Sequence, residues 1–389
     1  MTRVLFDHQA FCMQTHGGVS RCFVELYRHL PEDIQATICL RESNNAYIRE
    51  FGLADAESAA YDRWIVPGNW PCKGRLFNAW NWLRGERNYW SKEEYNRAEV
   101  IRQLKSGQFD IFHPTFFDDY FLPYLNGKPF VLTIHDMIPE LYSQSFDARW
   151  DEQMAGKRRL ATLANAIIAV SERTKEDVVR LLDIPADRVH VVYHGCSFPV
   201  VADAPRLVSE PYLLYVGSRS YYKNFDLFVR DVAPVLQRHP ELKVVCTGLE
   251  FSADELAIMQ QNGVQGRFLH YWVRDDAEFY SLYHFARGFV YSSEYEGFGI
   301  PILEAYQADC PVLLNRASCF PEIAGDAAVY FTMNRSESDF TAVLESFLMM
   351  ADAELADLKC RQRERLSRYS WERSAQQLAD VYRKIQRET

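Results

Sequence analysis

Ser-Ser-Glu-Tyr-Glu-Gly-Phe-Gly-Ile-Pro-Ile-Leu-Glu-Ala, residues 292–305, carries more information about this chain than any other stretch. It follows a run of strand-forming residues, 288–291, passes through Gly297 and Gly299, and continues into a helical pattern that opens at Pro301. Proline is favoured at the first position of a helix because its missing N–H costs no hydrogen bond there. The pattern predicts a strand, a glycine loop and a helix N-terminus, where free N–H groups can bind an anion such as phosphate.

Two glutamates belong to this segment. Glu296 lies in the loop and Glu304 lies about one turn inside the expected helix, so the two can contact different parts of one ligand that crosses the helix start. A carboxylate beside a bound phosphate is unfavourable unless it accepts hydrogen bonds, and sugar hydroxyls are suitable donors. The alternative is structural, with Glu304 interacting with the helix dipole and Glu296 solvated in the loop.

Short β-branched or aromatic runs alternate with helical patterns on both sides of this segment, which is typical of βα units on parallel sheets. We predict strands at residues 4–6, 36–40, 109–112, 130–134, 166–170, 189–193, 212–216, 243–247, 267–270, 288–291, 312–314 and 328–331. The alternation lapses between Gly195 and Pro211. The chain is therefore expected to be an α/β protein of two doubly wound, Rossmann-like domains, residues 1–200 and 206–370, with a C-terminal helix at 371–389 that packs back on the first domain.

Length and charge narrow the class of protein. The chain has 389 residues, more than the ~100–200 of a typical domain, and a formal net charge of −10. An acidic chain has no broad positive field, which argues against nucleic acid as a partner. The nine cysteines show no C-x-x-C pair or zinc spacing, which suits a reducing cytoplasm. Without a signal-peptide pattern or an apolar run of ~18 residues, we expect a cytoplasmic protein.

These features together resemble the retaining GT-B glycosyltransferases, specifically glycosyltransferase family 4. That family carries two glutamates separated by seven residues, which Glu296 and Glu304 match, and residues 310–328 look like the family's continuation. The resemblance covers nearly the whole chain and is weakest at residues 41–108. It implies a GT-B fold with a central cleft between two Rossmann-like domains.

The resemblance also implies roles for the residues of the glycine loop. Glu296 would contact the transferred sugar near its reacting carbon, and Glu304 would hold the ribose hydroxyls of a nucleotide diphosphate sugar. Backbone N–H groups around Gly297, Phe298 and Gly299 would bind sugar hydroxyls or phosphate.

Two cations, Arg219 and Lys223, lie at the end of the second domain's first expected strand, within Val-Gly-Ser-Arg-Ser-Tyr-Tyr-Lys-Asn at residues 216–224. Ligands of open α/β sheets bind beyond the carboxyl ends of the strands, so these cations are placed to neutralise a diphosphate leaving group. In the family the Arg commonly follows the Gly directly, where this chain has Ser218. Lys223 therefore matches the pattern and Arg219 would be a substitute. The alternative is that both are solvated loop cations.

A second glycine turn, Gly17-Gly18, lies between the first expected strand and a helix that runs to Leu30. Two glycines at that junction allow phosphate to approach a helix N-terminus, although a plain tight turn explains them as well. By the resemblance, Gly17 and Gly18 would meet the donor diphosphate from the opposite domain.

Two histidines follow buried strands of the first domain. His135 begins the His-Asp pair of Leu-Thr-Ile-His-Asp-Met-Ile-Pro-Glu, residues 132–140, and a neutral imidazole there can position a sugar hydroxyl. The resemblance makes His135 an active-site residue. Asp136 and His113 are weaker candidates for acceptor binding, with a helix cap and a satisfied core histidine as the alternatives. For His194 a structural role is favoured.

No Asp-x-Asp sequence occurs in the chain, and no His/Asp cluster has metal spacing. Helix N-termini and cationic side chains would then neutralise the diphosphate, as Mg²⁺ does in other enzymes. We predict transfer without a metal ion and without a cofactor, the nucleotide diphosphate sugar being a substrate.

Five of the eight tryptophans fall within residues 61–90, together with an excess of basic residues. Aromatic and basic residues suit membrane contact at headgroup level, a lipid diphosphate acceptor, or stacking on sugar rings. Trp80 and Trp82 are the acceptor-binding candidates. The alternative is that the tryptophans cap an open face of the first domain.

The leading functional prediction is a retaining hexosyltransferase that uses GDP-mannose or a UDP-hexose. Its acceptor would be a glycan or a polyprenyl-linked saccharide in surface polysaccharide synthesis, at the inner face of the membrane. A sugar nucleotide epimerase shares the architecture but needs further acid–base residues around the sugar ring. A non-catalytic nucleotide sugar or glycan binder is the third possibility.

Overall fold

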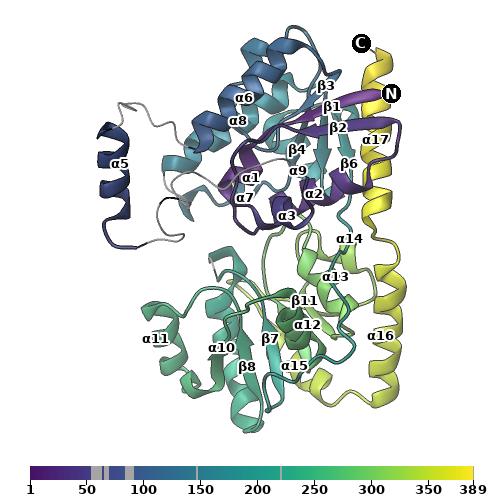
Figure 1. The fold of residues 1–389 in the computed structure, drawn as a ribbon. Coiled ribbons are helices and arrows are strands. Elements are labelled where there is room, and N and C mark those ends of the chain that lie inside the picture. The colour runs from purple at the N-terminus through teal and green to yellow at the C-terminus, as the bar shows by residue number, and fades with distance from the viewer. Residues whose placement is uncertain (54–63, 65–69, 84–91, 146–147, 220, 389) are drawn as a thin grey trace.

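The computed structural model describes residues 1–53, 64, 70–83, 92–145, 148–219 and 221–388. Its strands form two layered α/β units, one above the other in Figure 1. Each of the twelve predicted strands is present within two residues of its expected ends: β1 Thr2–Phe6, β2 Ile34–Ile38, β3 Ile111–His113, β4 Val131–Ile134, β5 Ala166–Ala169, β6 Val189–Val191, β7 Tyr212–Tyr215, β8 Lys243–Cys246, β9 Phe268–His270, β10 Gly288–Tyr291, β11 Val312–Asn315 and β12 Val329–Phe331. The α/β class and the two Rossmann-like domains predicted from the sequence are confirmed.

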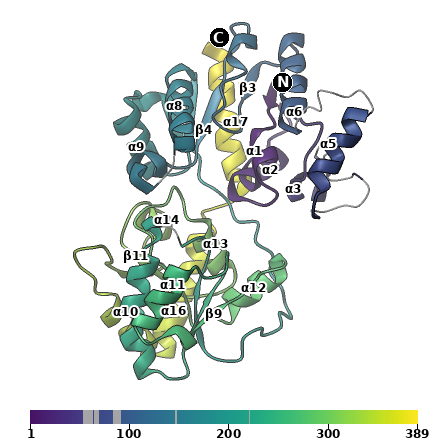
Figure 2. The ribbon, with the colours of Figure 1, turned by 90° about the vertical axis from the view of Figure 1, so that its left-hand side faces the viewer.

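In the N-terminal unit the strands run in the order β2-β1-β3 and β4-β5-β6, all pairs being parallel. A parallel bridge between Phe112 and Phe130 joins the two halves. The helices of this unit are α1 Gln9–Met13, α2 Gly18–His29, α3 Ala46–Glu50, α5 Lys73–Leu83, α6 Lys92–Ser106, α7 Ile138–Leu141, α8 Ala148–Leu163 and α9 Glu172–Leu182. Figures 1 and 2 show α5 at the outer edge of this unit.

The C-terminal unit has one parallel sheet in the order β12-β11-β10-β7-β8-β9. Its helices are α10 Phe225–Arg238, α11 Ala253–Gln261, α12 Asp276–His284, α13 Ile300–Gln307, α14 Phe320–Ala324, α15 Phe340–Leu348 and α16 Asp352–Leu366. The strand order reverses between β7 and β10, and ligands of doubly wound sheets bind at that switch point. The short 3₁₀ turns of the whole chain are η1 Leu122–Tyr124, η2 Ser143–Ser145, η3 Ala186–Arg188, η4 Tyr221–Lys223 and η5 Gln265–Arg267.

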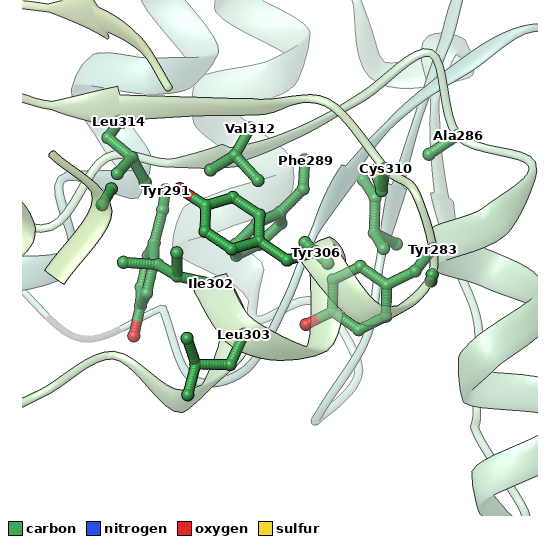
Figure 3. Packing of buried hydrophobic residues seen from close by; sticks show 14 of the residues in the cluster. Tyr283, Ala286, Phe289, Tyr291, Ile302, Leu303, Tyr306, Cys310, Val312 and Leu314 are labelled. Atoms are coloured by element: carbon green, nitrogen blue, oxygen red, sulfur yellow. The ribbon is translucent and has the colours of Figure 1, made fainter. Parts of the chain in front are cut away.

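The core beneath the switch point fixes the position of α13. Figure 3 shows Ile302 and Tyr306 of α13 among Phe289 and Tyr291 of β10 and Leu314 of β11, and all five are buried. Burying a side chain of this size contributes roughly 1.5–3 kcal/mol to stability, so the helix start is held firmly against the strand ends.

Helix α17, Trp371–Glu388, leaves the C-terminal unit and packs against α2, β1 and β5 of the N-terminal unit (Figure 1). The chain first passes between the units after Gly195. Where it returns, just before α17 begins, residues 370 and 371 pack directly against Gly195. A Cβ atom at Gly195 would lie 2.3 Å from the backbone nitrogen of Trp371, so only glycine permits this crossing. Two connections therefore join the units, and the domain limits at residues 200, 206 and 370 stay predictions.

The hydroxyl of Tyr382 on α17 contacts Nδ1 of His113 at 2.6 Å, and Nε2 of His113 contacts Thr133 Oγ1 at 2.8 Å. Tyr382→Phe should lower the free energy of unfolding by about 1–3 kcal/mol, because it leaves a buried ring nitrogen without its partner. Urea unfolding of the folded, full-length protein measures this. Tyr95→Phe, which removes the hydroxyl that an exposed Arg41 contacts, should stay within about 0.5 kcal/mol of the wild type. Equal changes in both variants would contradict the prediction.

In the described parts of the chain, no helix is both long enough and apolar enough to cross a bilayer.

Candidate functional site

Lys223 and Glu296 meet at the switch point of the C-terminal sheet. Lys223 ends η4, which follows β7, and Glu296 lies in the loop that follows β10; their side chains form an ion pair. The carbonyl of Lys223 accepts hydrogen bonds from Ser292 Oγ at 2.6 Å and Tyr215 Oη at 3.0 Å. The loop after β7 is thus tied to the end of β10, which brings a cation and a carboxylate to one point.

The backbone of Glu296 is held by Ser318, which precedes α14. The N–H of Glu296 donates to Ser318 Oγ at 3.1 Å, and the same hydroxyl donates to the Glu296 carbonyl at 2.8 Å. Glu296 is only 8% exposed. Its carboxylate is therefore positioned by the loop rather than free in solvent.

Gly297 brings the loop into contact with the other unit. A Cβ atom at Gly297 would lie 1.8 Å from the carbonyl oxygen of His135, so the absence of a side chain lets the two backbones touch. The Gly297 carbonyl accepts hydrogen bonds from Ser171 Oγ at 2.6 Å and Thr174 Oγ1 at 3.2 Å, both at the start of α9. Gly299 has a φ of +89°, a left-handed conformation that favours glycine, and it begins α13.

Further contacts keep this part of the cleft closed. The carboxylate of Glu322 on α14 accepts hydrogen bonds from the N–H groups of Glu172 at 2.7 Å and Arg173 at 3.2 Å, so it caps α9 across the domain boundary. Tyr295 Oη donates to Asp177 Oδ2 at 2.8 Å. The carboxyl end of the C-terminal sheet is therefore docked on the N-terminal unit.

His135 lies directly after β4 in the N-terminal unit, and its carbonyl oxygen faces Gly297. Burial lowers the pKa of His135 to about 4, so the imidazole is neutral near pH 7. Its Nε2 atom is buried, and no partner is found for it among the described residues. The next residue, Asp136, accepts a hydrogen bond from the N–H of Ile138 at 3.0 Å, which forms the turn into α7. A neutral ring nitrogen with spare hydrogen-bonding capacity suits the binding of a hydroxyl.

Glu304 lies on α13, one turn beyond the loop, and is 7% exposed. Burial raises the pKa of Glu304 to about 7, an effect that the nearby Arg21 opposes. The hydroxyl of Tyr283 donates to Glu304 Oε2 at 3.1 Å. Glu304 is thus a buried carboxyl that can change charge near neutral pH.

Gly17 and Gly18 stand at the N-terminus of α2. Gly18 is the first helical residue, and a Cβ atom there would meet nothing within 4 Å. A Cβ atom at Gly17 would lie 1.9 Å from Oε1 of Gln14. The turn is therefore packed at Gly17 and open at Gly18, and phosphate binding there stays a prediction.

A cluster of three side chains, two of them buried and His135 partly buried, was not expected from the sequence. Atoms of Cys22, His135 and His194 that could ligate a metal lie within 4.8 Å of one another, the one such group in the described ranges. Burial lowers the pKa of His194 to about 3 and raises the pKa of the Cys22 thiol. The three groups are neutral near pH 7, so a metal could enter only after the buried thiol loses its proton.

Sequence profiles of known families match both halves of the chain. Residues 16–197 match Glycosyltransferase Family 4 and residues 203–369 match Glycosyl transferases group 1. The chain is a family 4 glycosyltransferase.

The relatives of this glycosyltransferase include several mannosyltransferases. It is 28% identical to O-antigen chain mannosyltransferase B of Escherichia coli, over 57% of this chain and 61% of the relative. It is 23% identical to GDP-mannose:cellobiosyl-diphosphopolyprenol alpha-mannosyltransferase of Xanthomonas oryzae, over 68% of this chain and 71% of the relative. The chain thus spans less than two thirds of the length of the first of these proteins.

Solved structures share the GT-B fold. Anabaena HepE in complex with UDP and glucose superposes with a TM-score of 0.70 at 16% identity, over 99% of this chain and 100% of that one. Sucrose-phosphate synthase from Thermosynechococcus elongatus gives the same TM-score and identity, over 100% of both chains. The predicted GT-B architecture is confirmed.

Two of the predicted site residues of the glycosyltransferase are engaged elsewhere. Arg219 pairs with Glu255 at 2.7 Å and donates to the carbonyls of residues 247, 249 and 250, and its side chain is 4% exposed. It organises the loop after β8, so Lys223 is the cation at the switch point. The prediction that His113 binds an acceptor is corrected by the structure. His113 is fully buried and both of its ring nitrogens contact neighbours, so it cannot bind an acceptor in this structure.

The tryptophan candidates lie on α5. Trp80 is 47% exposed, and the side chain of Trp82 lies outside the described residues. Trp64 stacks on Trp70 with ring centroids 6.3 Å apart and contacts Phe77 edge-on at 5.5 Å. Part of the tryptophan-rich segment therefore packs on itself.

Two adjoining cavities lie in the N-terminal unit beside His135. The larger has a volume of about 790 Å³ and is bordered by α1, α6, α8 and residues 116–119. The smaller, about 200 Å³, shares Met13, Phe116, Phe117 and Gln153 with it and reaches His135 and Asp136. Aromatic rings next to carboxylates are features that bind sugars. The smaller cavity is therefore the one that contacts His135.

Sequence reasoning missed the residues that join the two units: Arg21, Ser171, Tyr295 and Glu322. Ser171 also caps α9 by accepting a hydrogen bond from the N–H of Thr174. A sequence pattern indicates such local hydrogen bonds, but it does not indicate a partner more than a hundred residues away. Arg21 ends the His-Gly-Gly-Val-Ser-Arg segment, one turn after the glycines. That spacing places it on the same face as the glycine turn and was the available signal.

Proposed function

We propose that this glycosyltransferase is a retaining enzyme that transfers a hexose, mannose from GDP-mannose in the first instance, to a glycan or polyprenyl-linked saccharide in surface polysaccharide synthesis. The observation that carries the proposal is the contact of Gly297 with His135. This contact brings the loop of Glu296, whose carboxylate pairs with Lys223, against the backbone of His135 in the other unit, and so supports a site shared by the two domains. The names of the mannosyltransferase relatives support mannose as the sugar, while the UDP bound in the Anabaena structure supports a UDP-hexose as the alternative.

In this proposal the donor diphosphate lies at the starts of α13 and α2, near Lys223. The bond between the anomeric carbon and the phosphate oxygen breaks as the acceptor oxygen attacks from the same face of the sugar. The acceptor proton passes to the leaving phosphate. Lys223 and the helix N-termini stabilise the charge that develops on that phosphate. Glu296 would release Lys223 when the donor binds and accept hydrogen bonds from the sugar.

The acceptor would occupy the two cavities beside His135. The larger one is bordered by four carboxylates, Glu93, Asp118, Asp119 and Glu152, and by Arg97 and Arg159. An excess of acids favours a ligand rich in hydroxyls over an anionic one. The neutral imidazole of His135 would position the attacking hydroxyl at the inner end.

A donor panel tests the activity. The full-length protein is incubated with GDP-mannose, UDP-glucose and UDP-galactose, with and without a glycan acceptor, and nucleotide release and products are followed. Acceptor-dependent release supports the proposal. Epimerised donor without transfer would favour the epimerase alternative, and binding without turnover a non-catalytic binder. Thermal stabilisation by GDP or UDP separately identifies the base, because only a bound nucleotide stabilises the folded state.

Transfer is expected to continue in excess EDTA, because Lys223 and two helix N-termini can supply the positive charge that a metal otherwise provides. Turnover should stay within about twofold of the untreated enzyme. The measurement is product formation before and after chelation, with Mg²⁺ and Mn²⁺ added back. Loss of activity that one divalent ion restores would overturn metal independence.

We further propose that α5 contacts the membrane surface. Leu76, Trp80 and Leu83 lie four and three residues apart on one face of this helix and are 50%, 47% and 73% exposed. Such a stripe beside a basic residue, Arg75, suits insertion at the headgroup level. Flotation with vesicles that contain anionic lipid should be lost when all three are changed to Ser. Leu163→Ser with Met349→Ser, two exposed apolar residues elsewhere, is the control; equal binding by both variants would reject the proposal.

A further inference from the structure

Arg21 reaches from the N-terminal unit to side chains of α12 and α13 in the C-terminal unit. It lies on α2, which faces α13 in Figures 1 and 2. Its Nε and Nη2 atoms donate to the hydroxyl and carbonyl of Ser197, in the connection between the units, at 3.2 and 3.1 Å. Its Nη1 lies 4.0 Å from Glu304 Oε1, and its Nη2 lies 3.9 Å from Asp276 Oδ2. One guanidinium thus touches both units and their connection.

Glu304 is surrounded by groups from several elements. Arg21 of α2, Tyr283 and Asp276 of α12, Tyr47 of α3 and Cys196 of the connection all interact with it, and Arg21 is the cation among them. Burial raises the pKa of Glu304 to about 7 and Arg21 lowers it, while Asp276 raises it. The charge of Glu304 near neutral pH therefore depends on Arg21.

We propose that Arg21 is a positioning residue for the donor: it keeps Glu304 as the carboxylate that accepts hydrogen bonds from the ribose, and it does so only when the cleft is closed. This inference rests on the proposed function and on the role that the family resemblance implies for Glu304, which is to hold the ribose hydroxyls of the donor. Because Arg21 and Glu304 belong to different units, separation of the units removes the cation. Glu304 then takes up a proton more easily and loses acceptor capacity. Donor binding and closure are thereby coupled.

The sign of the pH effect follows from the direction of the pKa shift. In the closed protein the carboxylate form of Glu304 is present above about pH 7 and is lost as the pH falls. Donor affinity should therefore rise between pH 6 and pH 8. Without Arg21 the same rise should occur at higher pH, because nothing opposes the effect of burial.

The experiment compares Arg21→Met with the wild type by measuring the donor Kd calorimetrically between pH 6 and pH 9. We expect donor binding to be roughly fivefold weaker than in the wild type at pH 7 and to recover to within about 1.5-fold at pH 9, which corresponds to a pKa of Glu304 about one unit higher. Arg21→Lys should recover part of the loss. Arg28→Met, on the same helix but paired with Glu25 at 3.2 Å, should match the wild type.

The Glu304→Gln background provides the decisive comparison. If Arg21 acts through Glu304, adding Arg21→Met to Glu304→Gln should weaken donor binding by less than twofold. A loss that is equal at every pH, or that persists in the Glu304→Gln background, would show that Arg21 contacts the donor itself and would overturn the inference. Near-UV circular dichroism confirms folding of each variant. If the folded wild type bound no nucleotide sugar of the panel, the proposed function would fail first, and the inference with it.

Discussion

Glu296→Gln is expected to lower kcat by about 10²–10³-fold, the size of effect seen when a group that stabilises the transition state is removed. The carboxylate forms an ion pair with Lys223 at the point where the strand order of the sheet reverses. Glutamine keeps the shape and the backbone contacts with Ser318 but loses the charge. The transferred sugar would then lack its charged hydrogen-bond acceptor while its bond to phosphate breaks.

The affinity for the nucleoside diphosphate product separates this role from a structural one. In the structure Lys223 is occupied by Glu296, so a diphosphate must displace that carboxylate before it can use the cation. Glu296→Gln should therefore bind GDP or UDP as well as the wild type or better, although it turns over slowly. Lys223→Met should do the opposite and weaken diphosphate binding.

Stopped assays give kcat, and titration calorimetry gives the Kd of the diphosphate. Glu337→Gln, an exposed carboxylate of the same unit, serves as the matched control and should change neither. Unchanged turnover in Glu296→Gln would remove Glu296 from the reaction. A parallel loss of turnover, diphosphate affinity and thermal stability would show that the loop had merely collapsed.

The sequence predicted the strands well because local patterning and local structure coincide in βα units. Each buried parallel strand is a short apolar run, and each loop at the switch point contains glycine or proline, so positions could be assigned within two residues. The Glu296-Gly297 loop and Lys223 could be placed at strand ends for the same reason. These are properties of residues close together in the sequence.

Contacts between distant residues could not be predicted in this way. Arg219 and Lys223 look alike from the sequence, yet Arg219 is held by Glu255 and three carbonyls, and Lys223 faces Glu296. His113 ends β3 and His135 follows β4, yet α17 covers His113 through Tyr382. Packing from another part of the chain decides which of two similar side chains reaches the cleft.

Gly297→Ala is expected to lower kcat by about 10²-fold or more while leaving the fold of each unit intact. The added Cβ would lie 1.8 Å from the carbonyl oxygen of His135 and 3.2 Å from Cβ of Asp136. Contacts under 3 Å with backbone cannot be relieved by rotating a side chain, so the two units must move apart by an ångström or more. A displacement of about 1 Å at the reacting groups can cost about 10²-fold in rate.

The same displacement should weaken the contacts that close the cleft. Ser171 and Thr174 donate to the carbonyl of Gly297 itself, so these hydrogen bonds would lengthen together with the separation of Glu296 from His135. Small-angle scattering should show a larger radius of gyration for Gly297→Ala in the presence of donor. Nucleotide affinity should fall much less than kcat: Lys223 and Glu304 both remain in the C-terminal unit, and the loss of Arg21 from Glu304 weakens donor binding only about fivefold at pH 7.

Gly266→Ala is the matched control, because a Cβ atom at that glycine of η5 would meet nothing within 4 Å. It should keep the turnover and the scattering profile of the wild type. If Gly297→Ala turned over like Gly266→Ala, the backbone contact with His135 could not be part of the reacting geometry. The contact between Gly297 and His135 could then no longer support the proposed function, although the family of the chain would stand.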